Sequence, residues 1–394
     1  MLGKTNISTL SEGAIVTEIE DFKWVQMQSG IYGNFVKAIY KNNYLAAITA
    51  DGTVVYTTDG EVWQTSVLEY EDCKLNDVDW DGSRFILVGS YTDASRNPVD
   101  EYGLILCTTD FVTYEKVVIP NAEDSTISNI RYDREYIVIY PVNGKYIIVA
   151  KRRNTSRNDL IVFAGDLVNT WDSNNVISSS FEGGTVSIAK SSNEILLCYV
   201  GYFTNPIKYY NSVCKIAGNA TCSLLFRTDV NNKIPQFSVF ECKDELFYRS
   251  ARPTDNYKFV KVLNSSEEII LSTDINYMFI DGVYFNSCQL FINNHEMMVV
   301  KKGESLANKT LDDLIEIAPE LTMNCITKAF GQLYIFGNQG AILKSSVETN
   351  NENAIAVQTL SAKKALADAK AYSDERYAEL EARIIALEAG QIPE

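Results

Sequence analysis

The sequence predicts an all-β propeller of seven blades followed by an α-helical coiled coil. A strand–turn–strand pattern recurs along most of the chain, and helical periodicity is absent there apart from a short stretch at 311–317. A C-terminal run rich in Ala, Glu, Lys, Arg and Leu, without Gly or Pro, predicts the helix. The chain therefore divides into a strand-rich body and a helical tail.

Residues 51–63 (DGTVVYTTDGEVW) contain the clearest copy of one repeated turn. An apolar strand leads into Thr-Thr-Asp-Gly, and Trp63 opens the next strand. Gly60 can adopt the positive φ that tight turns often need, and the Asp59 carboxylate can accept hydrogen bonds from amides of its own turn. Related stretches lie at 102–114, with Asp110 and Tyr114 in equivalent places, and more weakly at 160–171 and 339–346.

A hairpin of apolar strand, polar turn and apolar strand recurs seven times. The first apolar residue after each turn is Tyr44, Phe85, Tyr136, Ile195, Leu246, Leu290 and Leu333. The spacing is about 48 residues, which is the range of a four-stranded propeller blade. Seven blades are therefore expected, and a count of six or eight is left open.

The last copy lacks an outer strand, whereas Trp24 begins a strand before the first hairpin. We therefore expect Trp24 to open the outermost strand of the last blade and to close the ring. This organisation gives an N-terminal segment at 1–21, a propeller at 22–347, a polar linker at 348–360 and a coiled-coil helix at 361–389.

The helix carries an apolar seam with a heptad spacing. Leu at d and Ile at a favour two strands, and charged e and g positions suit ion pairs between parallel chains. The alternative is a lone amphipathic helix folded back on the propeller. The expected oligomerisation residues are Tyr377, Leu380, Ile384 and Leu387 in the seam, with Arg376, Glu381, Arg383 and Glu388 beside it.

Composition excludes several classes of partner. The formal net charge is -16 and the pI is near 4.7, so nucleic acid and anionic membranes would be repelled. The N-terminus has no apolar signal-peptide core and no stretch has membrane-spanning length, so we expect synthesis in a cytoplasm and no membrane insertion. Eight scattered cysteines and one histidine predict reduced core thiols, no structural metal and no cofactor.

The densest aromatic stretch, residues 199–211, is the expected ligand surface. Aromatic faces beside an amide suit stacking against a sugar. The alternative is that these residues are strand edges packed between blades. The candidate ligand-binding residues are Tyr202, Phe203, Tyr209, Tyr210 and Asn211.

Catalytic and metal readings have weaker support. Residues 77–83 imitate half of a calcium loop, but Val88 stands where a Glu ligand belongs. His295 lies in a turn-like context without a nucleophile motif. Arginines that could hold a substrate carboxylate, as in a sialidase, lie in no recognisable motif, and they are Arg84, Arg131, Arg227, Arg249 and Arg252. No catalytic residue is assigned and we expect no enzyme.

The turn ending in Trp63 resembles the Asp-box, or bacterial neuraminidase repeat, of sialidase-like propellers, although it lacks the residue between Asp59 and Gly60. In that family the boxes are structural. Residues 366–383 resemble helices of tailed-bacteriophage tail, baseplate and fibre proteins, which implies a homotrimer, with a dimer as the other option.

Together the two resemblances imply a non-enzymatic virion protein of a phage tail or baseplate. It would display propellers on an oligomeric stalk, contact other virion proteins and bind a host-surface glycan or protein. The alternatives are a sialidase-like glycan-processing enzyme and a purely structural docking or spacer protein of the particle.

Overall fold

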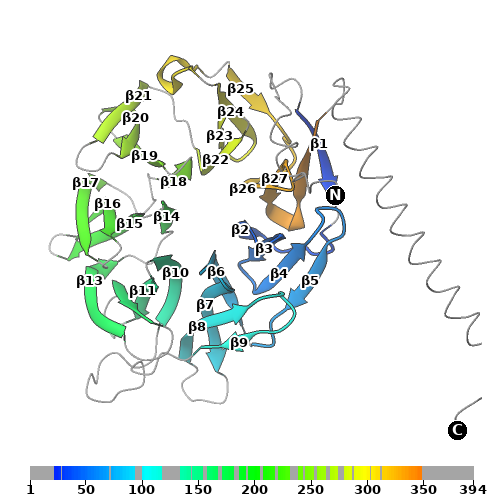
Figure 1. Cartoon of the computed structure of the whole chain (residues 1–394). Helices are drawn as coiled ribbons and strands as arrows, with labels where there is room; N and C mark the ends of the chain where they lie inside the picture. The colour runs from blue at the N-terminus through cyan, green and yellow to red at the C-terminus, as the bar shows by residue number, and fades with distance from the viewer. Residues whose placement is uncertain are drawn as a thin grey trace, which may run out of the picture. The chain divides into compact units, whose positions relative to one another are not determined.

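The computed structural model describes residues 22–347 apart from several short stretches and a longer one at 118–133. The segment 1–21, the linker 348–360 and the predicted helix 361–389 lie outside the described residues, and with them all eight expected oligomerisation residues. The described chain is a β-propeller (Figure 1). Its strands form six hydrogen-bonded sheets arranged around a ring.

The first two sheets each have four strands in chain order. The first comprises β2 (Phe35–Lys41), β3 (Tyr44–Thr49), β4 (Thr53–Thr57) and β5 (Gln64–Val67). The second comprises β6 (Lys74–Trp80), β7 (Phe85–Asp93), β8 (Asp100–Thr108) and β9 (Glu115–Lys116).

The third sheet has eight strands. Its first half comprises β10 (Arg134–Val142), β11 (Lys145–Arg153), β12 (Asn158–Gly165) and β13 (Trp171–Phe181). Its second half comprises β14 (Ser187–Lys190), β15 (Glu194–Thr204), β16 (Ile207–Ala217) and β17 (Cys222–Val230). Phe181 of β13 pairs with Gly201 of β15, and this pairing joins the halves.

The remaining three sheets have four strands each. They comprise β18 (Ser238–Cys242), β19 (Glu245–Arg252), β20 (Asp255–Val262) and β21 (Glu267–Thr273); then β22 (Asp281–Phe285), β23 (Cys288–Ile292), β24 (Glu296–Val300) and β25 (Leu314–Glu316); and finally β26 (Met323–Ala329), β27 (Gln332–Gly337), β28 (Ile342–Val347) and β1 (Phe22–Met27). Two short 3-10 helices, η3 (Leu306–Asn308) and η5 (Asn338–Gly340), lie between strands.

Closure of the ring follows the expectation from Trp24. The strand β1, which contains Trp24, lies next to β28 at the edge of the last sheet. The N-terminal strand thus completes a sheet whose other strands come from the end of the described chain.

Three sequence expectations need correction. Where seven blades are expected, the strands form six hydrogen-bonded sheets, because the Phe181–Gly201 pairing joins two strand groups into one sheet. The third hairpin differs from the expected one: β10 includes residues of the expected turn before Tyr136, and the chain reverses between β10 and β11 instead. The stretch with helical periodicity at 311–317 contains the strand β25. β25 has only three residues, so an alternating strand pattern cannot be recognised there.

The core lies between neighbouring sheets. The first strands of consecutive sheets face the centre of the ring (Figure 1), where β2 contacts both β6 and β26. Apolar side chains from facing sheets form the clusters that hold them together. One such cluster joins the first and second sheets through residues such as Ile48, Leu87 and Leu104. Another joins the two halves of the eight-stranded sheet through Ile147, Val162 and Leu197.

Candidate functional site

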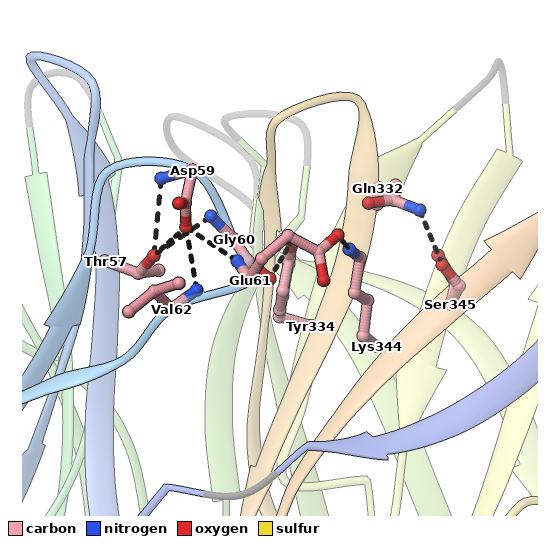
Figure 2. A network of polar contacts seen from close by, with 9 residues as sticks. All are labelled: Thr57, Asp59, Gly60, Glu61, Val62, Gln332, Tyr334, Lys344 and Ser345. Atoms are coloured by element: carbon pink, nitrogen blue, oxygen red, sulfur yellow. Dashed lines mark hydrogen bonds and ion pairs between the residues drawn. The ribbon is translucent and has the colours of Figure 1, made fainter. Parts of the chain in front are cut away.

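The turn after β4 is held by the Asp59 carboxylate (Figure 2). Its Oδ1 accepts hydrogen bonds from the backbone N–H groups of Glu61 at 2.8 Å and Val62 at 2.9 Å, and from the Thr57 hydroxyl at 2.9 Å. The Gly60 N–H donates to Thr57 Oγ1 at 3.0 Å. Burial raises the pKa of Asp59, but these donors outweigh it and hold the pKa below its usual value. The carboxylate is therefore a structural acceptor.

This turn also fastens the first sheet to the last. The Tyr334 hydroxyl donates to the Gly60 carbonyl at 3.4 Å, and Lys344 pairs with Glu61 (Figure 2). The centroids of the Trp63 and Phe336 rings lie 5.9 Å apart, and the two rings pack edge to face. The turn after β4 thus lies between the first and the last sheet, where the ring closes.

The turn after β8 repeats this geometry. Asp110 Oδ1 accepts from the N–H groups of Val112 and Thr113, both at 2.9 Å. The N–H groups of Thr113 and Val112 hold the pKa of Asp110 below its usual value. Phe111 is fully buried here, and the centroid of its ring lies 4.4 Å from that of the Phe85 ring. Asp59 and Asp110 therefore have the same structural task on successive sheets.

A buried charge cluster lies among the inner strands, and sequence reasoning missed it. Lys190 on β14 pairs with Asp77 on β6, and its Nζ lies 2.9 Å from Asp79 Oδ2. Burial lowers the pKa of Lys190, but the two carboxylates outweigh it and raise that pKa above its usual value. Lys37 on β2 adds a positive charge that acts on both Asp77 and Asp281 of β22.

The same carboxylates tie consecutive inner strands together. Asp77 Oδ2 accepts from the Ile139 N–H of β10 at 3.0 Å, and Asp281 Oδ2 accepts from the Ile326 N–H of β26 at 3.0 Å. This arrangement orients the inner strands and satisfies buried polar groups. Asp77, the first residue of the stretch at 77–83 that imitates half of a calcium loop, is thus an ion-pair partner of Lys190.

The rest of that loop is also engaged. Asp81 Oδ1 accepts from the N–H groups of Ser83 at 2.8 Å and Arg84 at 2.9 Å, which closes the turn between β6 and β7. Burial raises the pKa of Asp81, but its donors lower it to about 2. Among the described residues no three His, Cys, Asp or Glu side chains are grouped to hold a metal.

The expected ligand stretch at 199–211 is a hairpin of long strands rather than a loop. Tyr202 pairs with Tyr209 and Asn211 with Val200 across β15 and β16, and Phe203 lies between Tyr202 and the tip. Tyr210 is only 5% exposed. Its ring belongs to the cluster between β10–β12 and β15–β16, with the Arg227 guanidinium 4.4 Å away. Burial therefore removes Tyr210 from an accessible sugar surface.

The other candidate side chains have separate structural partners. Arg84 pairs with Asp81 at 3.3 Å, while Arg227 donates to the Ser212 hydroxyl at 3.3 Å. His295 lies in the exposed turn between β23 and β24, with Nδ1 3.0 Å from the Leu321 carbonyl. The side chains of Arg131, Arg249 and Arg252 lie outside the described ones.

Comparison with known proteins supports the fold alone. No protein-family model matches the chain, and no curated protein matches its sequence. The WD40 domain of Pan2 from Neurospora crassa superimposes with a TM-score of 0.52 and 8% identity, over 85% of this chain and 98% of that one. Virginiamycin B lyase from Staphylococcus aureus superimposes with a TM-score of 0.48 and 11% identity, over 82% of this chain and 99% of that one. BamB from Moraxella catarrhalis superimposes with a TM-score of 0.46 and 9% identity, over 82% of this chain and 98% of that one. No helix in the described part of the chain is long and apolar enough to cross a membrane.

Proposed function

We propose that this protein is a non-enzymatic receptor-binding component of a phage tail or baseplate. Propellers would be displayed on an oligomeric stalk and would bind a glycan or protein on the host surface. The proposal also includes contacts with other virion proteins and a location in the virion after synthesis in the host cytoplasm.

One observation carries the binding part of the proposal. The hairpins between second and third strands are longest along one arc of the ring, and we call them the arc hairpins: β7–β8, β11–β12, β15–β16 and β19–β20. Their strands have 8 to 11 residues, whereas those of β3–β4, β23–β24 and β27–β28 have 5 or 6. Because the sheets repeat around the ring, these hairpins emerge on one face. Such a face suits recognition by projecting segments on a rigid scaffold.

The stalk part rests on the heptad at 361–389. When several propellers are joined, the second contact with a surface becomes intramolecular. The overall avidity then exceeds the affinity of a single site by roughly 10²–10⁴-fold. We propose a homotrimer, with a dimer as the other option, joined by the seam residues Tyr377, Leu380, Ile384 and Leu387.

Two finer structural points belong to the same proposal. We infer that the two halves of the eight-stranded sheet act as separate blades, which gives seven. Their facing cluster, from Val138 to Ile216, resembles the cluster between other neighbouring sheets. We also infer that the turns at Asp59 and Asp110 are Asp-box turns, since each carboxylate accepts from amides of its own turn.

Light scattering on the full chain and on residues 1–350 tests the stalk. The full chain should have two or three times the mass of its monomer, whereas the truncation should be monomeric. A monomer in both cases would overturn the oligomer.

The labelled full chain should also bind a subset of bacterial strains in a panel. If no strain is bound, the spacer alternative gains support. Turnover of fluorogenic sialosides or other glycosides would instead favour the sialidase-like alternative.

A further inference from the structure

Three tyrosine rings form a row beside the connection between the first two sheets. Tyr70 lies in the connection between β5 and β6, Tyr91 on β7 and Tyr102 on β8. The centroid of the Tyr91 ring lies 5.4 Å from that of Tyr70 and 5.5 Å from that of Tyr102. We call these three residues the tyrosine row.

A lysine lies against this row. Lys116 Nζ lies 3.9 Å from the centroid of the Tyr91 ring and 5.3 Å from that of Tyr70, and it donates to the Tyr91 hydroxyl at 2.7 Å. Lys116 is exposed, since it belongs to the short edge strand β9. An ammonium donor and the Tyr91 hydroxyl thus lie beside aromatic faces, whereas the Tyr102 hydroxyl is buried.

Burial shows that the row is anchored on one side and accessible on the other. Tyr70 and Tyr91 pack against the apolar cluster that contains Leu104 and Leu106, yet all three tyrosines are half-buried. Rings held in this way lose little conformational freedom when a ligand binds.

The row is part of an arc hairpin, and its strand pairing recurs on another. Tyr91 pairs with Tyr102 on the third rung from the end of β7–β8, and Tyr202 pairs with Tyr209 on the third rung from the end of β15–β16. A pair of tyrosines therefore occupies the third rung from the end in two arc hairpins. This placement connects the row to the face proposed for binding.

We propose that the tyrosine row with Lys116 is a binding site for a neutral saccharide. The C–H face of a pyranose would lie on the exposed side of the tyrosine row, while Lys116 and the Tyr91 hydroxyl would bind sugar hydroxyls. The Tyr102 hydroxyl is buried and takes no part. The net charge of -16 disfavours polyanionic glycans and so favours a neutral one. The inference rests on the proposed function, which it deepens by naming the ligand class and the site.

Saturation-transfer-difference NMR on the full chain tests this site. The probes are methyl glycosides of glucose, galactose, mannose and N-acetylglucosamine, with methyl glucuronide as the acidic arm. At least one neutral glycoside should receive saturation. Tyr91→Ala and Lys116→Met should each raise the dissociation constant for that glycoside by about tenfold or more. The matched control is Tyr32→Ala, since Tyr32 is 91% exposed and lies outside the row.

Tyr102→Phe keeps the ring and removes only a buried hydroxyl, so it should bind the glycoside nearly as well as the wild type and far better than Tyr91→Ala. If a neutral glycoside binds equally well to Tyr91→Ala, Lys116→Met and the wild type, the site is wrong while glycan binding elsewhere survives. A signal for the glucuronide alone also overturns the inference. If no glycoside binds but cells are still bound, this site is overturned and receptor binding stands. If neither occurs, both proposals fail.

Discussion

Phe111 has the backbone conformation that Gly60 has in the neighbouring turn: their φ angles are 58° and 75°. Left-handed backbone costs a non-glycine residue roughly 1–2 kcal/mol. Phe111 offsets that cost by burying its whole ring among Tyr56, Phe85 and other aromatics. A side chain at position 60 could not offset the cost in this way, because its Cβ would lie 2.2 Å from the Tyr334 hydroxyl oxygen.

Gly60→Ala should therefore destabilise the propeller by more than its φ cost alone. Gly144→Ala is the matched control, since Gly144 has φ +74° and no atom within 4 Å of an added Cβ. Urea unfolding should show the control losing roughly 1 kcal/mol and Gly60→Ala distinctly more. Equal losses would mean that Tyr334 does not constrain the turn.

The Asp110 turn should show a defined pH dependence. The pKa of Asp110 is lowered in the folded chain by the N–H groups of Thr113 and Val112. The stabilisation is therefore complete above the unfolded pKa of about 3.9 and is lost as pH falls through the folded value.

Asp110→Asn should reduce the free energy of unfolding at pH 7 by roughly 1 kcal/mol, and the difference from wild type should shrink below about pH 4. Chemical denaturation at a series of pH values measures both effects. Thr109→Ala, at an exposed neighbour in the same turn, should leave the pH dependence unchanged. A pH-independent loss in Asp110→Asn would contradict the role of the carboxylate charge.

The inner charge cluster should behave as one unit. Lys190→Met leaves the buried Asp77 carboxylate without its ion-pair partner and should cost about 3–5 kcal/mol, the range for breaking a buried pair. Asp77→Asn in the same chain should restore much of that loss while keeping an acceptor for the Ile139 N–H. A double-mutant cycle measures the coupling. Additive losses would show that Lys190 and Asp77 act independently.

Ring closure through β1 can be tested by truncation. Deleting residues 1–27 removes β1 and leaves β28 as an unpaired edge, whereas deleting 1–21 retains β1. The longer deletion should lower the thermal midpoint by several degrees relative to the shorter one, because a sheet edge is exposed. Identical midpoints would contradict closure by the N-terminal strand.

Alternation and turn residues predicted most of the fold because they act locally. The pattern around Asn42 and Asn43, for example, gave the β2–β3 hairpin directly. The third hairpin differs because the charged stretch before Tyr136 resembles a turn but belongs to β10, whereas the connection between β10 and β11 has the stronger turn sequence Asn-Gly at residues 143–144.

The sites were harder to predict because they depend on how sheets meet. Lys190 and Asp77 are 113 residues apart, and only the ring brings them together. Likewise the tyrosine row combines a connection residue, Tyr70, with a cross-strand pair whose register no local pattern specifies. Dense aromatic sequence pointed to residues 199–211, although Tyr210 there is part of the core.

The central claim is that propellers bind a host surface through two or three linked copies. Titrating cells of a bound bacterial strain with labelled full chain and with residues 1–350 tests it most directly. The full chain should bind the cells roughly 10²-fold or more tightly per propeller than the truncation, whose binding should remain measurable. Equal affinities, or no binding to any strain in the panel, would contradict the claim.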